Sequence, residues 1–218
     1  MKQDFVNNDF ADILLNRHSI RHFDPKVNID RQTLTDMISA TITAPSACNL
    51  QAWKFIVVDT EAGKDKLRQC FMKFNSPQLK TCAAMVVIFA DALAFHSYRD
   101  LWDQAYQAGR ITAEKRDEVL ATFLPLYERA PKEMLIVDAQ RDASLAAMQL
   151  MLIARAYGYD SNPIAGYDGK QLTQLLDLDP ERYTPCMALA IGKADPDHAE
   201  EEVKSIRYAL EDVLSFVD

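Results

Sequence analysis

The stretch of sequence that decides the fold is AAMVVIFAD, residues 83–91, an apolar run that contains β-branched side chains and ends on an acid. Two similar runs are KFIVVD at residues 54–59 and PCMALAIG at residues 185–192. Apolar runs of this length, bounded by turn or polar residues, are typical of strands buried inside a sheet. We therefore expect these three segments to form the centre of a sheet.

Helical patterns lie between the expected strands. Asp30 is a good N-cap for a helix over residues 31–44, which Pro45 ends. The side chains at helical spacing in this helix are Leu34, Met37, Ile38, Thr41 and Ile42. Residues 138–157, DAQRDASLAAMQLMLIARAY, are nearly apolar all round after the first turn, which indicates a helix buried on more than one side. This pattern suggests a core shared with a second subunit.

A helical insert is expected after the second strand, at about residues 93–130. Its aromatic side chains, set among charges, are Trp102, Tyr106, Phe123 and Tyr127. They can stack on a planar acceptor in a pocket or pack inward between the helices, and the sequence leaves both interpretations open. No repeat, low-complexity tract or Gly/Pro/Ser linker divides the chain. We expect a single domain over residues 1–218 with helices and strands mixed.

Composition limits the classes of partner. The chain has 218 residues, 49% of them hydrophobic, and a formal net charge of −8, which disfavours nucleic acid and anionic lipid. The N-terminal residues carry acids and amides where a signal peptide needs an apolar run, and no apolar stretch is long enough for a membrane span, so we expect a cytoplasmic protein. The four cysteines are Cys48, Cys70, Cys82 and Cys186. They form no CxxC pair or metal-ligand cluster, so we expect reduced thiols and no metal.

The segment NRHSIRHFDP, residues 16–25, concentrates positive charge and hydrogen-bond donors in an acidic chain. In an extended backbone Arg17, Ser19 and Arg21 point to one face, where they form a candidate phosphate clamp. The chain has only six glycines, and none of them forms a GxGxxG or P-loop motif, so a phosphate would have to be bound by side chains. In the alternative interpretation the arginines merely pair with surface acids such as Asp12.

Two turn-rich segments add further polar groups. The first, APSACNLQAWKF at residues 44–55, carries side chains that can present donors and acceptors to a planar heterocycle, namely Ser46, Asn49 and Gln51. The second, SNPIAGYDG at residues 161–169, contains Gly166, which would let the backbone approach a ligand closely. The plainer interpretation is that both are ordinary connections and that Trp53 packs in the core.

Four segments together resemble the nitroreductase family of flavin-dependent oxidoreductases, in the family's order and across nearly the whole chain. They are RHSIR at residues 17–21, PSACNLQAW at 45–53, NPIAGY at 162–167 and KSIRYALEDV at 204–213. The resemblance implies an α+β fold with a central mixed β-sheet flanked by helices. It also implies an intertwined homodimer that binds FMN at the subunit interface.

The resemblance assigns roles to individual residues. The ribityl phosphate of FMN would be held by Arg17, His18, Ser19 and Arg21, with Arg207 and Lys204 reaching it from the C-terminal segment. The flavin would lie near Asn75 and Gln78 and be lined from the neighbouring subunit by Pro45, Ser46, Asn49 and Gln51. The residues expected along the isoalloxazine are Pro163, Ile164, Ala165 and Gly166, with a backbone amide near Gly166 facing N5. No side chain is expected to act as a catalytic acid, base or nucleophile.

This chain departs from the family pattern at three positions, where it has Ala47, Ala52 and Ala165. FMN binding is still expected, because the contacts of the late turn are made by the backbone. The implied activity is NADPH- or NADH-dependent reduction of small acceptors such as nitroaromatics or quinones, in a ping-pong cycle at the flavin.

Other functions remain open on the sequence. One is a homodimer that binds or senses FMN without turnover, and another is a flavin-free interaction protein whose arginines are surface ion pairs. A third lies within the family, a flavin-dependent dehalogenase or dehydrogenase.

Overall fold

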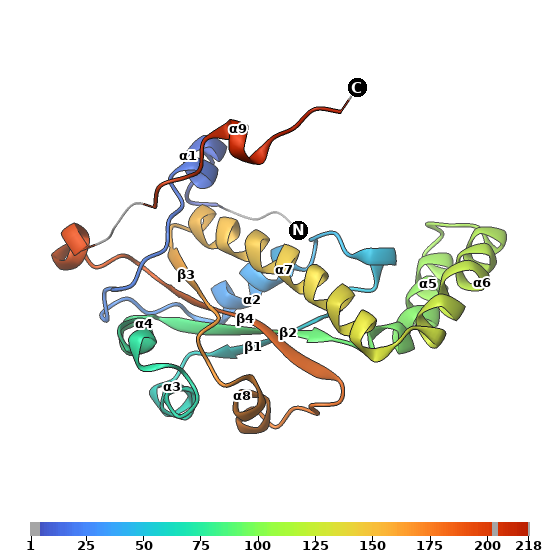
Figure 1. The fold of residues 1–218 in the computed structure, drawn as a ribbon, viewed down its shortest axis with the longest axis horizontal. Helices are drawn as coiled ribbons and strands as arrows, with labels where there is room; N and C mark the ends of the chain where they lie inside the picture. Colours follow the sequence, from blue (N-terminus) through green and yellow to red (C-terminus); the bar gives the residue numbers. More distant parts are fainter. Residues whose placement is uncertain (1–4, 202–204, 218) are drawn as a thin grey trace.

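The computed structural model describes residues 5–201 and 205–217 of the chain (Figure 1). Its centre is a four-stranded sheet in the order β1-β2-β4-β3. The strands are β1 Trp53–Val58, β2 Ala84–Asp91, β3 Asp160–Ile164 and β4 Tyr183–Gly192. The three apolar runs form β1, β2 and β4, as expected, but only β2 and β4 are central, because β1 lies at one edge of the sheet and β3 is added at the other edge beside β4.

The α+β class is confirmed, but the four strands all pair antiparallel, whereas a mixed sheet was expected. The connections from β1 to β2 and from β3 to β4 return the chain to the end of the sheet that it has just left. Between β2 and β3 the chain crosses to the opposite end, but these two strands are separated by β4, which runs antiparallel to both. Within residues 5–201 and 205–217, parallel pairing is limited to one isolated bridge between Ser19 and Ser161.

Helices cover both faces of the sheet (Figure 1). One face packs against α2 Arg31–Thr41 and α7 Lys132–Ala156, and the other against α3 Glu61–Arg68, α4 Ser76–Thr81 and α8 Gly169–Leu175. Strand β2 alternates between the two layers, since Val86 and Ile88 pack with α7 whereas Met85 and Val87 pack with α3 and α4. A strand buried on both faces explains why residues 83–91 are apolar without interruption.

The helices match the sequence patterns, with shifted ends. Asp30 caps α2 as expected, because its carboxylate accepts the Thr33 N–H at 2.9 Å, but the helix ends at Thr41 instead of residue 44. The pattern at residues 138–157 is the later part of α7, which already begins at Lys132. The clear error is β3, which was expected as part of a turn. Pro163 favoured a turn over a strand in the sequence analysis. A proline is tolerated in β3 because β3 is an edge strand.

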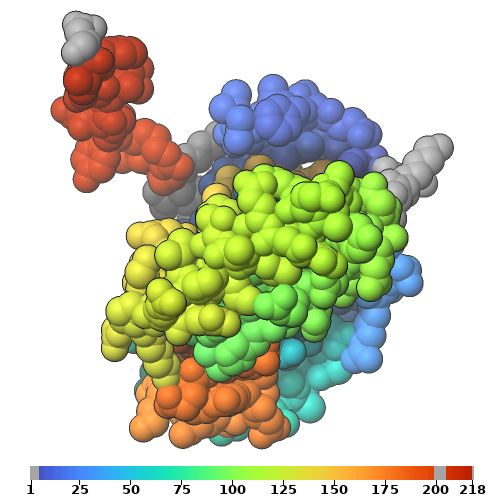
Figure 2. Space-filling view, turned by 90° about the vertical axis from the view of Figure 1, so that its right-hand side faces the viewer, coloured from blue at the N-terminus to red at the C-terminus, as the bar shows by residue number. Residues whose placement is uncertain are grey.

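The remaining elements lie outside the two covering layers. Helices α5 Tyr98–Gln107 and α6 Ala113–Arg129 occupy the region expected as a helical insert and dominate the face shown in Figure 2. The two short terminal helices are α1 Phe10–Leu15 and α9 Leu210–Val213, and the 3₁₀ turns are Ala47–Asn49, Lys73–Asn75, Ala94–Ser97 and Pro196–Glu201. None of the helices described here has the length and apolar character needed to cross a membrane.

Candidate active site

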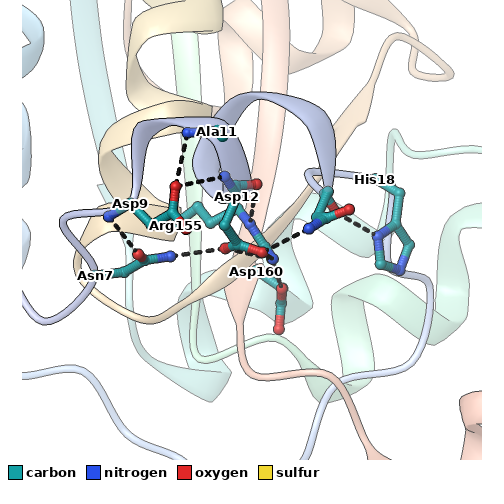
Figure 3. Close-up of polar contacts among 8 residues, drawn as sticks. Asn7, Asp9, Ala11, Asp12, His18, Arg155 and Asp160 are labelled. Carbon is teal, nitrogen blue, oxygen red and sulfur yellow. Dashed lines mark hydrogen bonds and ion pairs between the residues drawn. The ribbon is translucent and has the colours of Figure 1, made fainter.

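The segment that carries Arg17 is held from its N-terminal side by a polar network (Figure 3). Arg155, at the end of α7, donates to both carboxylate oxygens of Asp12 at 2.9 and 3.0 Å and pairs with Asp160 of β3 at 3.4 Å. Asn16 and Asn7 also donate to Asp12, each at 2.8 Å. The hydrogen bonds from Asn16 and Arg155 lower the pKa of Asp12 to about 2. Asp12 is therefore ionised and bound to Arg155, and this ion pair links α1 to α7.

The next residues are fixed against the edge of the sheet. Ser19 forms a parallel bridge with Ser161 of β3, and the Ile20 N–H donates to the Ser161 carbonyl at 3.2 Å. Ile20 and Phe23 are buried in the core at 2% and 0% exposure. Because alternate side chains of an extended segment point to opposite faces, burying Ile20 leaves its neighbours Ser19 and Arg21 on the other face.

Arg17 is half-buried, and its Nη1 atom is buried with no hydrogen-bond partner in the described part of the chain. The alternative in which Arg17 pairs with Asp12 is wrong, because Arg155 takes that carboxylate. The neighbouring His18 has its Nδ1 atom 2.9 Å from the Asn16 carbonyl oxygen. A buried guanidinium nitrogen without an acceptor costs free energy unless a ligand supplies one.

Asn75 and Gly166 are far apart in sequence but bonded in the structure. The Asn75 Nδ2 atom donates to the Gly166 carbonyl at 2.9 Å, and the Met72 N–H donates to the same oxygen at 2.9 Å. A Cβ atom at Gly166 would lie 2.7 Å from Asn75 Nδ2, so this approach requires a glycine. The Gly166 N–H donates to no other described residue and is free for a ligand.

The structure also locates the other residues expected near the flavin. Gln78 of α4 is buried at 4% exposure, and its Oε1 atom has no partner within the described chain. Ile164 is buried at 3% exposure in the core, so it can line a ligand only with its backbone. Pro163 pairs with Leu189 in the sheet, and Ala165 is exposed.

The loop expected to line the flavin from a second subunit lies elsewhere on the molecule. Cys48 in this loop packs with Tyr98 and Trp102 of α5. Three of its non-glycine residues have left-handed backbones, Cys48, Asn49 and Gln51, with φ of 50, 59 and 51°. The Gln51 N–H donates to Ser46 Oγ at 3.0 Å, whereas Pro45 is exposed. The loop is thus a strained turn that presents amides beside the α5–α6 pair.

Asp142 of α7 supports this loop and was missed by the sequence analysis. Its Oδ1 atom accepts the Ala47 N–H at 2.9 Å, while its Oδ2 atom is buried with no partner among the described residues. Burial raises the pKa of the Asp142 carboxyl above its usual value. No clear signal marked it in the sequence, because Asp142 stands beside the polar residues Gln140 and Arg141 at the start of the apolar pattern.

Within the described part of the chain, no bond joins Arg207 to Arg17. Arg207 is exposed, and its Nη1 atom donates to Ser205 Oγ at 2.6 Å and to the Ile206 carbonyl at 3.1 Å. Lys204 lies outside the described residues. The roles expected of both residues stay predictions.

The groups that do converge fit the FMN expected from the resemblance. They offer a buried guanidinium nitrogen for a phosphate, a free backbone N–H at Gly166, and amides at Asn75 and Gln78 for a heterocycle. In the described part of the chain no group of His, Cys, Asp or Glu is arranged to hold a metal, and the four cysteines are unpaired. Burial raises the pKa of the Cys70 and Cys82 thiols to about 11.

Comparisons with known proteins were made on the whole chain. Residues 14–193 match the model of the nitroreductase family. The chain is 48% identical to the CLA biosynthesis enone reductase of Lactiplantibacillus plantarum, over 99% of this chain and 97% of that protein. It is 28% identical to the major NAD(P)H-flavin oxidoreductase of Aliivibrio fischeri, over 94% of this chain and 96% of that one.

Solved structures agree with these sequence matches. The crystal structure of an enone reductase named CLA-ER superposes with a TM-score of 0.89 at 48% identity, covering 98% of this chain and 100% of that one. A protein of Exiguobacterium sibiricum, described as a nitroreductase and crystallised in complex with FMN, superposes with a TM-score of 0.91. It is 34% identical, and the match covers 100% of both chains.

Proposed function

Because this chain belongs to the nitroreductase family, we propose that it reduces nitroaromatics, quinones or similar acceptors in a ping-pong cycle. The protein is an oxidoreductase that uses FMN as its bound cofactor and NAD(P)H as its electron donor. When bound, FMN supplies two-electron chemistry, taking hydride from the nicotinamide and passing it to an acceptor on the same face.

The observation that carries this proposal is the convergence of three separate segments on one edge of the sheet. In the proposal, Arg17 and Ser19 bind the phosphate, while Asn75 holds the Gly166 carbonyl and so orients the free Gly166 N–H toward N5. Gln78, whose buried Oε1 atom has no partner in the described chain, hydrogen-bonds to the heterocycle beside them. A donor aimed at the reacting edge stabilises negative charge that develops there, and it does so without moving.

The relatives' names extend the range of acceptors. A protein 48% identical over 97% of its length is named an enone reductase, so we include α,β-unsaturated carbonyl compounds among the proposed acceptors. The test below separates the alternative of an FMN sensor without turnover from this proposal. A flavin-dependent dehalogenase or dehydrogenase would be recognised in the same test only by adding a halogenated or reduced substrate.

The test is the absorbance spectrum of the purified protein, repeated without oxygen after NADPH and then NADH. Oxidised flavin bands should bleach with at least one nucleotide and return when a nitroaromatic, a quinone or an enone is added. Bands that never bleach would indicate a protein that binds FMN without turnover. No bands after FMN addition would contradict the proposed function.

We also propose that the protein is a homodimer. The outer face of α7 exposes Met134, Val137 and Leu145, at 56, 44 and 49%. In the C-terminal segment, which stands away from the body in Figure 2, Ile206 and Phe216 are 95% and 88% exposed. Val137, Leu145 and Met148 of α7 line one hollow together, and an exposed apolar patch of this kind is typical of an interface. Light scattering should give twice the chain mass of 24.7 kDa, and a monomer mass at micromolar concentration would contradict the proposal.

A further inference from the structure

A cavity of 450 Å³ lies between the strained loop and helix α5. One wall is formed by Asn49 and Gln51, the loop amides that the family resemblance places against the flavin of the neighbouring subunit. The other lining residues come mainly from α5, where Leu101 and Ala105 form an apolar wall beside the polar Gln104. The volume is in the usual range for a small-molecule site.

The lining of this cavity carries one positive charge. Of its described lining residues, Arg110 is charged and none is acidic, although the whole chain has a net charge of −8. Arg110 lies in the turn between α5 and α6, directly after Gly109, whose φ is +67°. Its backbone N–H is fixed by a 3.0 Å bond to the Ala105 carbonyl. The guanidinium has no hydrogen bond or ion pair with any described residue.

Three arginines that line other cavities of the described chain are each paired with an acid. Arg31 pairs with Asp59 at 2.6 Å, and Arg182 pairs with Asp91 at 2.7 Å. Arg141, in a third cavity, pairs with Asp138. These residues stabilise the surface by local pairing, whereas Arg110 keeps its charge available. Since the surrounding protein is acidic, an anionic ligand needs such a local cation to enter.

We propose that Arg110 is a specificity-determining residue that binds the carboxylate of an acidic electron acceptor. The apolar wall of α5 holds the body of the acceptor, and the amides of the loop position its reducible end toward the flavin. A guanidinium binds a carboxylate through two parallel hydrogen bonds, which orients the ligand as well as holding it. This inference rests on the proposed function, because it places the acceptor beside the flavin.

The test compares 4-nitrobenzoate with its methyl ester, two acceptors that differ in the carboxylate charge. Arg110→Ala removes a charged hydrogen bond, so it should lower kcat/KM for the acid about tenfold or more. The kcat/KM for the ester should stay within about twofold of the wild-type value. Arg110→Lys should retain part of the preference for the acid. Arg99→Ala, which removes a charge from α5 outside the cavity lining, should change neither value.

A binding measurement tests the role of Arg110 independently of turnover. The FMN-loaded, oxidised protein is titrated with 4-nitrobenzoate without any nicotinamide nucleotide, and Arg110→Ala should raise the Kd about tenfold. Equal binding by wild type and variant, or equal losses of acid and ester turnover, would overturn the inference. Wild-type protein that reduces neither compound with NADPH or NADH would overturn the proposed function, while the titration would still decide the role of Arg110.

Discussion

Arg17→Ala should weaken FMN binding by roughly 10- to 150-fold, which is the loss of one charged hydrogen bond of about 1.5 to 3 kcal/mol. The Arg17 Nη1 atom is buried without a partner in the described chain, and the acid that might have neutralised it is bound to Arg155. Arg17 is therefore held ready for an external anion. Removing it should also reduce the dependence of the Kd on salt concentration, since one screened charge contact is lost.

Titration of the apoprotein with FMN at several salt concentrations measures both effects. Arg31→Ala is the control, because it removes an arginine whose partner is Asp59 and should leave FMN affinity unchanged. Arg207→Ala tests the second cation expected at the phosphate. Unchanged affinity in both the Arg17 and the Arg207 variants would eliminate the phosphate clamp.

Gly166→Ala should lower FMN affinity by at least about 30-fold. The new Cβ atom would lie 2.7 Å from Asn75 Nδ2 and 2.9 Å from Phe74 Cζ. Phe74 is 70% exposed and can turn away, but Asn75 is 5% exposed and has no such freedom. Overpacking costs about 1 to 3 kcal/mol, and a buried amide forced off its carbonyl partner costs a similar amount. Both changes fall where the flavin is proposed to lie.

The same substitution at another glycine is the matched control. A Cβ atom at Gly169 would meet Pro185 at 3.7 Å, an ordinary contact, so Gly169→Ala should bind FMN like the wild type. Circular dichroism establishes that each variant folds. In an Asn75→Ala background the added methyl group has room, so the further loss of FMN affinity caused by Gly166→Ala should be smaller. Equal FMN affinity of Gly166→Ala and wild type would refute the role of this turn.

Much of the fold follows from local patterns. The apolar runs locate β1, β2 and β4, and Asp30 locates the start of α2. The run of β2 is uninterrupted because this strand is buried on both faces. The pattern does not reveal β3, since Asn162 and Pro163 are usual in turns. Only pairing with β4 makes that segment a strand.

The candidate site divides in the same way. The sequence by itself predicted the family of the chain. Through the resemblance to that family it also predicted residues that would bind a phosphorylated heterocycle, among them Arg17, Asn75 and Gly166. It did not indicate that Asn75 bonds to Gly166, that Asp142 supports the strained loop, or that Arg155 leaves Arg17 unpaired. Residue type and local spacing are properties of the chain, but partners distant along the chain are chosen only when the sheet and α7 bring them together. The tertiary structure therefore decided which charges are neutralised and which remain available for ligands.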